Sequence, residues 1–170
     1  MPAARTKRSA GNGPLCVPYS SLFQNGGYCK DIIDNLLVFG KNERELQGNE
    51  NKLHNFAKIT KENKVIISRF VDIRKSCLER VDDIYCHHYF KRCYLSSAPQ
   101  TVCREACEDL MFNVCDQEIK TALEFNRDRP KLFYWKYYWD IINCTTLPSR
   151  NESSNCYYPD KTRGQYGKKG

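Results

Sequence analysis

The sequence contains no long apolar run. No stretch approaches the roughly 18 consecutive apolar residues that predict a transmembrane helix, so the sequence predicts no membrane span. Residues 1–15 also lack the apolar core of a secretory signal, and we expect a mature piece of a longer protein if the chain is extracellular. There is no internal repeat, and 170 residues suffice for one domain with a modest core.

Histidine is scarce, and the three histidines form no pattern typical of catalysis or metal binding. His87 and His88 are neighbours, whose side chains point about 100° apart on a helix and suit one metal ion poorly. The segment from Cys86 to Cys93 faintly resembles the Cys-Cys-x-x-His-x-x-Cys motif of secreted phospholipase A2. However, Phe90 stands at the position of the catalytic histidine and cannot act as a general base. We therefore expect no enzyme activity, no catalytic residue and no metal site.

The net charge of +7 is concentrated at the two ends of the chain. Residues 1–15 contribute three basic residues and no acid, and residues 160–170 contribute four basic residues against Asp160. These tails carry +6, which leaves +1 for residues 16–159. Because charge on flexible ends usually only solvates a chain, we expect no nucleic-acid partner. Binding of heparan sulfate through the tails stays open.

Cysteine is abundant, with ten residues in the chain. None of the pairs has the C-x2-C spacing of a zinc site, whereas an even number of widely spaced cysteines is typical of secreted, disulfide-linked domains. The sequons that begin at Asn143 and Asn151 agree with a secretory route and predict N-glycosylation there. The sequence therefore indicates an extracellular protein.

The segment 101–115 shows the clearest periodicity. Its apolar and cysteine positions recur at the three- and four-residue steps of one buried stripe on an α-helix. The stripe comprises Cys103, Ala106, Cys107, Leu110, Met111, Val114 and Cys115. Thr101 is the expected N-cap, and Ile119 and Leu123 predict an extension past Cys115. Three covalent links would thus start from one helix, around which the remaining chain packs.

Upstream, the pattern is more varied. We expect an irregular loop over residues 16–29, a short strand over residues 36–39 that ends at Gly40, and a polar loop over residues 40–50. Helical spacing returns over residues 51–77, where the polar residues 61–64 separate two helices or bend one. A further helix runs from Leu78 towards Cys93.

The order of these features resembles a Frizzled-type cysteine-rich domain, the extracellular Wnt-binding module. The resemblance covers residues 16–156 and rests on ten cysteines in order, Cys103-Arg-x-x-Cys107, Tyr85-Cys86 and Cys144-x-x-Leu-Pro148. Within the family the chain looks most like the ROR and MuSK receptor tyrosine kinases. The features are Cys16-x-Pro-Tyr19, Val102-Cys-Arg-Glu-Ala-Cys-Glu108 and Asn143-Cys144-x-x-Leu-Pro148 followed by Asn155-Cys156.

The resemblance implies a mainly α fold with several helices, one small two-stranded β element and five disulfides. The implied pairs are Cys16–Cys93, Cys29–Cys86, Cys77–Cys115, Cys103–Cys156 and Cys107–Cys144. It also implies the ligand-binding ectodomain of a cell-surface receptor whose ligands are Wnt-family lipoglycoproteins. We expect residues 1–15 to be a flexible lead-in, residues 16–156 the Frizzled-type domain and residues 157–170 a linker.

Two sets of residues are candidates for ligand contact. An apolar groove for an acyl chain would be lined by Leu53, Phe56, Ile66, Phe70 and Phe90. The same residues could instead be core, or line a closed cavity that holds a fatty acid. A protein interface is predicted at Phe133, Tyr134, Trp135, Tyr137, Tyr138 and Trp139, which could also form a lid over the core.

The segments 29–77 and 115–144 are longer than the family leads us to expect, and the aromatic run lies in the second. Three functions stay open at this point. The chain is a Wnt-binding receptor domain, a fatty-acid-binding extracellular domain without other cofactor, or a module that contacts a co-receptor or heparan sulfate.

Overall fold

The computed structural model describes residues 14–23, 26–34, 36–67, 73–94, 98–128, 142–153 and 155–159. Its elements follow in the order β1 (Leu15–Pro18), α1 (Tyr19–Leu22), α2 (Lys30–Ile33), β2 (Leu37–Gly40), α3 (Glu43–Ile67), α4 (Lys75–Tyr89), α5 (Arg104–Asp109), the π-helix η1 (Leu110–Val114), α6 (Asp116–Asp128) and the 3-10 helix η3 (Cys144–Thr146). The mainly α fold with a small sheet and five disulfides confirms the predicted fold class.

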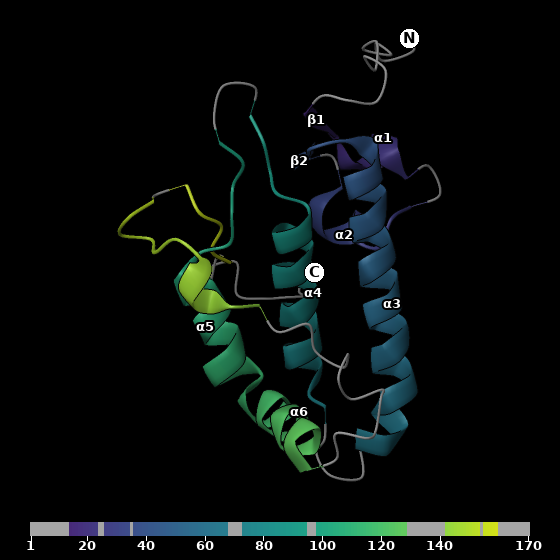
Figure 1. Cartoon of the computed structure of the whole chain (residues 1–170), viewed down its shortest axis with the longest axis vertical. Coiled ribbons are helices and arrows are strands. Elements are labelled where there is room, and N and C mark those ends of the chain that lie inside the picture. The colour runs from purple at the N-terminus through teal and green to yellow at the C-terminus, as the bar shows by residue number, and fades with distance from the viewer. Residues whose placement is uncertain are drawn as a thin grey trace.

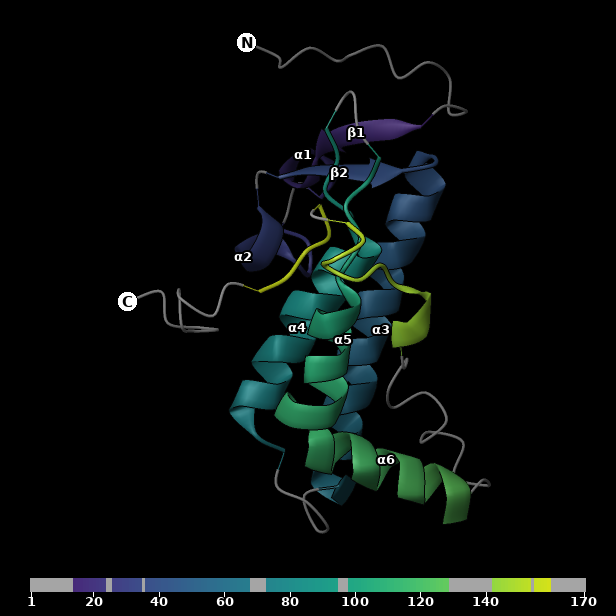
Figure 2. The same ribbon diagram turned by 90° about the vertical axis from the view of Figure 1, so that its left-hand side faces the viewer.

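Helix α4 lies between α3 on one side and α5 with η1 on the other (Figures 1 and 2). The two strands pair antiparallel at one end of the helices, with Cys16 opposite Phe39. Helix α6 crosses the other end. Because α4 is covered on both sides, it buries Cys77, Val81, Ile84, Tyr85 and Cys86. One apolar core therefore surrounds α4.

The predicted stripe of residues 101–115 is buried except for Val114, which is half-buried, but the helix that carries it is not regular. Helix α5 begins at Arg104 with Cys103 as its N-cap residue, so the predicted cap at Thr101 is wrong. The N–H of Cys115 donates to the carbonyl of Leu110, five residues back, at 2.9 Å. This wide turn adds one residue and turns the next side chains back by about 100°. Cys115 consequently faces α4, where it bonds to Cys77.

The N-terminal third is more ordered than the sequence indicates. The predicted loop over residues 16–29 contains most of β1 and all of α1. The predicted loop over residues 40–50 is also wrong, because α3 begins at Glu43 and continues through residues 61–64. Only the strand ending at Gly40 is confirmed here, as β2.

The start of α3 has a local cause. The side chain of Asn42 accepts a hydrogen bond from the N–H of Glu45 at 2.8 Å, which satisfies one of the unpaired donors of the first turn. Leu46 is then buried over Gly40, where a Cβ would come within 2.5 Å of the leucine side chain. Glycine at position 40 therefore allows the close approach of α3 to β2.

Five disulfides cross-link the chain, and they are the pairs that the family resemblance implies. They join Cys16 to Cys93, Cys29 to Cys86, Cys77 to Cys115, Cys103 to Cys156 and Cys107 to Cys144. No helix among the described residues is long and apolar enough to cross a membrane.

The folded part extends beyond the predicted boundary at Cys156. Tyr157 forms a parallel bridge with Val102, and its N–H donates to the carbonyl of Thr101 at 2.7 Å. Pro159 is buried. Residues 157–159 thus belong to the packed structure rather than to a linker, while residues 160–170 and 1–13 lie outside the described residues.

Candidate functional site

Among the residues predicted to line an apolar groove, the three whose side chains are described do not share one exposed surface. Leu53 of α3 and Phe90, which follows α4, are each only 1% exposed. Phe90 packs edge-on against Tyr19, with ring centroids 4.9 Å apart. These two residues are core, which was the alternative interpretation. The side chain of Ile66 and all of Phe70 lie outside the described part.

Phe56 is the groove candidate that reaches the surface among those described. It is half-buried between α3 and α4, where its ring lies 5.2 Å from that of Tyr85. Tyr85 in turn stacks on Tyr89 at 6.3 Å. We call Phe56, Tyr85 and Tyr89 the aromatic row. Its outer end is polar, because the ammonium of Lys52 lies 5.9 Å from the ring centroid of Tyr89.

A hollow of about 320 Å³ lies on another face of α3. It is open to solvent and is lined by Phe23, Gly26, Gly27, Gln47, Glu50, Asn51 and His54. Residues 47, 50, 51 and 54 recur at helical spacing, so one face of α3 provides most of the wall. The lining is mainly polar and therefore does not match the predicted acyl groove.

Glu50 forms the buried floor of this hollow. Its carboxylate accepts hydrogen bonds from the Tyr19 hydroxyl at 2.8 Å and from the N–H of Tyr28, and it lies 2.9 Å from Nε2 of His54. The Tyr19 oxygen accepts from the N–H of Cys29 at 2.9 Å. Buried charge requires such partners, and the network ties the segment before α2 to α3. Its geometry indicates a structural role.

The tyrosines of this network are held in the neutral form. Burial, and to a lesser degree the Glu50 carboxylate, raises the pKa of Tyr19, although the hydrogen bond from Cys29 acts in the opposite direction. Burial also raises the pKa of Tyr28, whose hydroxyl donates to Asp82 at 2.6 Å. Burial likewise raises the pKa of Asp82. All three groups therefore bind a proton more tightly in the folded state.

The C-terminal segment is held against α4 by contacts that the sequence analysis missed. The Tyr157 hydroxyl donates to Asp83 at 2.8 Å, and its ring stacks on that of His87 with centroids 3.6 Å apart. His87 is buried, with Nδ1 2.9 Å from the backbone oxygen of Asp83. The three side chains fix the end of the domain rather than form a surface for a ligand.

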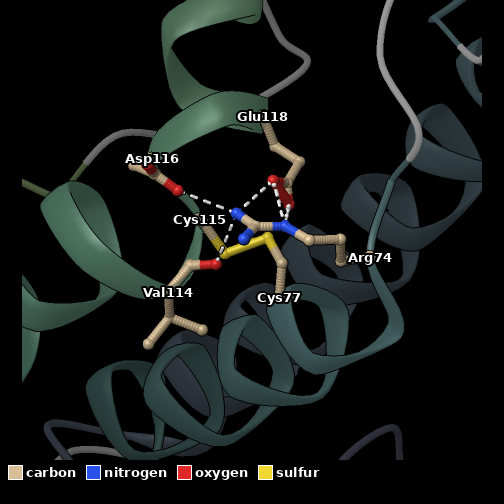
Figure 3. Close-up of polar contacts among 6 residues, drawn as sticks. All are labelled: Arg74, Cys77, Val114, Cys115, Asp116 and Glu118. Carbon is tan, nitrogen blue, oxygen red and sulfur yellow. Dashed lines mark hydrogen bonds and ion pairs between the residues drawn. A yellow bond between two sulfur atoms is a disulfide. The ribbon is translucent and has the colours of Figure 1, made fainter.

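A second missed cluster joins α4 to α6 beside the Cys77–Cys115 disulfide (Figure 3). The Arg74 guanidinium donates to Glu118 at 2.7 Å, to Asp116 at 2.8 Å and to the carbonyl of Val114 at 2.9 Å. The bonds to Glu118 and, less strongly, to Asp116 raise the pKa of Arg74, and the bond from Arg74 lowers the pKa of Asp116. The cluster neutralises the buried Glu118 carboxylate and is structural.

The aromatic candidates for a protein interface, at residues 133–139, lie outside the described residues. Asn143 and Asn151 are both exposed.

Among the described side chains, the one cluster with metal-ligand atoms comprises Cys77, Cys115 and Glu118. Its two cysteines form a disulfide, so they offer no thiolate to a metal.

Helices around a central α4, a two-stranded sheet and five disulfides define a cross-linked, mainly α-helical cysteine-rich domain. The Fz domain family model matches residues 20–151, and the chain belongs to this family. No curated protein matches the sequence. Fz domains are extracellular, non-catalytic ligand-binding domains that bind Wnt-type ligands.

Proposed function

We propose that the chain is the ligand-binding ectodomain of a ROR/MuSK-like receptor and binds Wnt-family lipoglycoproteins. The observation that carries the proposal is the Fz family match over residues 20–151. Support for the receptor subgroup comes from the motifs Cys16-x-Pro-Tyr19 and Val102-Cys-Arg-Glu-Ala-Cys-Glu108. The hydrogen bond from Tyr157 to Asp83 also supports it. A C-terminal end held rigidly against α4 would transmit the effect of ligand binding to the segment that follows the domain.

Phe56 and Tyr89, the two half-buried members of the aromatic row, form the surface on which we expect the acyl chain of such a ligand to pack, with the buried Tyr85 beneath them. An acyl chain gains about 25 cal/mol for each Å² of apolar surface that it removes from water. Phe56 offers such a surface because it is half-buried at the boundary of α3 and α4, with core residue Leu53 one helical turn away. Lys52 beside Tyr89 would face the polar part of the ligand.

Binding of the purified domain to Wnt proteins with and without their acyl chain tests the proposal. Phe56→Ala should weaken binding of the acylated form about ten-fold or more and leave weak binding of the deacylated form unchanged. Phe112→Ala is the matched control. Phe112 is a phenylalanine at the surface as well, but it is more exposed than the half-buried Phe56, at 71%, and it lies on η1, which follows α5 on the side of α4 opposite to α3 (Figure 1).

The outcomes separate the candidate functions. Equal binding of both Wnt forms would contradict the acyl contact and favour a protein–protein surface. Absence of binding to either form would contradict Wnt recognition. Fatty acid in an organic extract of the pure protein would then favour a lipid-binding domain. Salt-sensitive heparin retention that disappears when residues 1–13 and 160–170 are removed would instead favour a heparan sulfate or co-receptor module.

A further inference from the structure

The first sequon has a disulfide-bonded cysteine at its centre. Cys144 separates Asn143 from Thr145, and its sulfur is bonded to that of Cys107 on α5. Cys107 is fully buried. The second sequon, Asn151-Glu-Ser153, has an exposed glutamate at its centre instead. The two sequons therefore differ in whether a covalent bond fixes the acceptor segment to the core.

The segment around Asn143 is fixed at several points once this disulfide has formed. Ile142 and Leu147 are buried on either side of it. The N–H of Arg104 donates to the carbonyl of Pro148 at 2.9 Å, and Nε of Arg104 donates to that of Leu147 at 3.1 Å. Glycan transfer requires the acceptor segment to enter the active site of a transferase, and a short turn held on both sides by the core cannot rearrange to do so even where its side chains are exposed.

Asn143 nevertheless lies at the surface of the folded domain. Asn143 and Thr145 are both exposed, and the Thr145 hydroxyl donates to Oδ1 of Asn143 at 2.7 Å. An attached glycan would project into solvent and would not displace any core residue. The fold thus tolerates the glycan but hinders its attachment.

We infer that closure of the Cys107–Cys144 disulfide ends the period in which Asn143 accepts an N-linked glycan. Glycan transfer forms a bond from Nδ2 of Asn143 to the anomeric carbon of a lipid-linked oligosaccharide. The bond from that carbon to the lipid diphosphate breaks, and one amide proton is released. Closure transfers two electrons and two protons from the two thiols to an oxidised dithiol oxidoreductase by thiol–disulfide exchange. The two reactions compete for the same three-residue segment, so glycan occupancy at Asn143 depends on the rate of oxidation.

The test measures occupancy of both sequons in newly made chains that carry a secretory signal. Cells receive a short metabolic label, the protein is captured from the lysate, and each site is quantified by mass spectrometry after enzymatic deglycosylation in ¹⁸O water. Thr145→Ala removes the first sequon and verifies the assignment of the peptide. Asn151 in the same molecules is the internal reference.

Cys107→Ser leaves the sequon intact but prevents the disulfide, and it should raise occupancy at Asn143 about two-fold. Occupancy at Asn151 should stay unchanged. Cys103→Ser is the matched control, because it removes the Cys103–Cys156 disulfide from the same buried helix and leaves Cys107 and Cys144 able to pair. Occupancy at Asn143 should then equal that of the unmodified sequence.

Three results would overturn the inference. The first is an Asn143 site that is fully occupied, or fully unoccupied, in the unmodified sequence and in Cys107→Ser alike. The second is a partial occupancy that Cys107→Ser does not change. The third is an equal rise of Asn143 occupancy in Cys103→Ser. Slow folding in general, rather than the Cys107–Cys144 disulfide, would then control glycan occupancy at Asn143.

Discussion

Arg74 holds the junction of α4 and α6 together, and its replacement by alanine should destabilise the domain. The Glu118 carboxylate is 1% exposed, and the Arg74 guanidinium donates to it through Nε and Nη2. Arg74→Ala removes these bonds together with those to Val114 and Asp116. Arg74 lies against the Glu118 carboxylate in the unmodified domain (Figure 3), so the variant leaves this buried carboxylate without its cation.

The size of the effect follows from burial. Loss of one partner of a buried ion pair typically costs about 3–5 kcal/mol, because the other charge stays desolvated. The Arg74 side chain is 37% exposed, so in the variant water can partly solvate the Glu118 carboxylate in place of the guanidinium. We therefore expect Arg74→Ala to lower the free energy of unfolding by about 2–3 kcal/mol. The Cys77–Cys115 disulfide keeps the two helices linked, so the fold itself should persist.

Guanidinium chloride unfolding of the oxidised domain measures this change. The midpoint should fall without a change in slope, because the surface exposed on unfolding stays the same. Lys75→Ala is the control. The Lys75 side chain is 90% exposed, and its ammonium lies 3.5 Å from Glu79, so its loss should change stability by less than about 0.5 kcal/mol.

A double variant provides the refutation. Arg74→Ala combined with Glu118→Leu removes both charges and should recover part of the lost stability, because a buried ion pair can be replaced by apolar groups at little cost. If the double variant is no more stable than Arg74→Ala, the buried carboxylate is not the cause. If Arg74→Ala lowers the free energy of unfolding no more than Lys75→Ala does, burial of Glu118 does not make its ion pair important for stability.

Three further predictions follow from the core and the Glu50 network. The pKa values of Tyr19 and Tyr28 are raised in the folded state, so their contribution to stability is complete below the ordinary tyrosine pKa of about 10 and is lost as pH rises above it. Unfolding free energies measured at about pH 8 and about pH 11 should show this fall, and Tyr28→Phe should reduce it; an unchanged fall in that variant would contradict the assignment. Leu110→Asp should prevent secretion because it places a charge in the core. Phe112→Asp is the control, because Phe112 is exposed, and this variant should be secreted normally. Immunoblots of medium and lysate compare the two variants. Gly27→Ala should lower the melting temperature, since the added Cβ would lie 1.9 Å from the Tyr19 hydroxyl oxygen; an unchanged melting temperature would show that the segment can move away.

The sequence was most informative where covalent or periodic constraints act locally. The stripe of residues 103–115 was identifiable because three cysteines share its spacing with apolar residues. The start of α3 carries a local signal as well, because Asn42 followed by Glu45 is a capping signature, but the sequence analysis predicted a loop there from the polar composition of residues 40–50. The π turn left no such sign, because its effect is to direct Cys115 towards Cys77, a residue 38 positions away in the sequence.

Contacts between distant segments account for the remaining differences. Tyr157 lies in a polar stretch, and its hydroxyl partner Asp83 is 74 residues away, so no local pattern indicates that the domain continues past Cys156. Helical spacing placed Leu53 and Phe56 on apolar faces. It could not distinguish core from surface, because that depends on how closely α3 approaches α4.

We propose above that the disulfide-linked domain is a receptor for Wnt-type ligands. The most direct measurement is a titration of the oxidised domain against an immobilised, acylated Wnt protein, with a reduced and alkylated sample beside it. We predict saturable binding by the oxidised domain and loss of binding with loss of helical circular dichroism in the reduced sample. A folded, oxidised domain that binds no member of a Wnt panel would contradict the account.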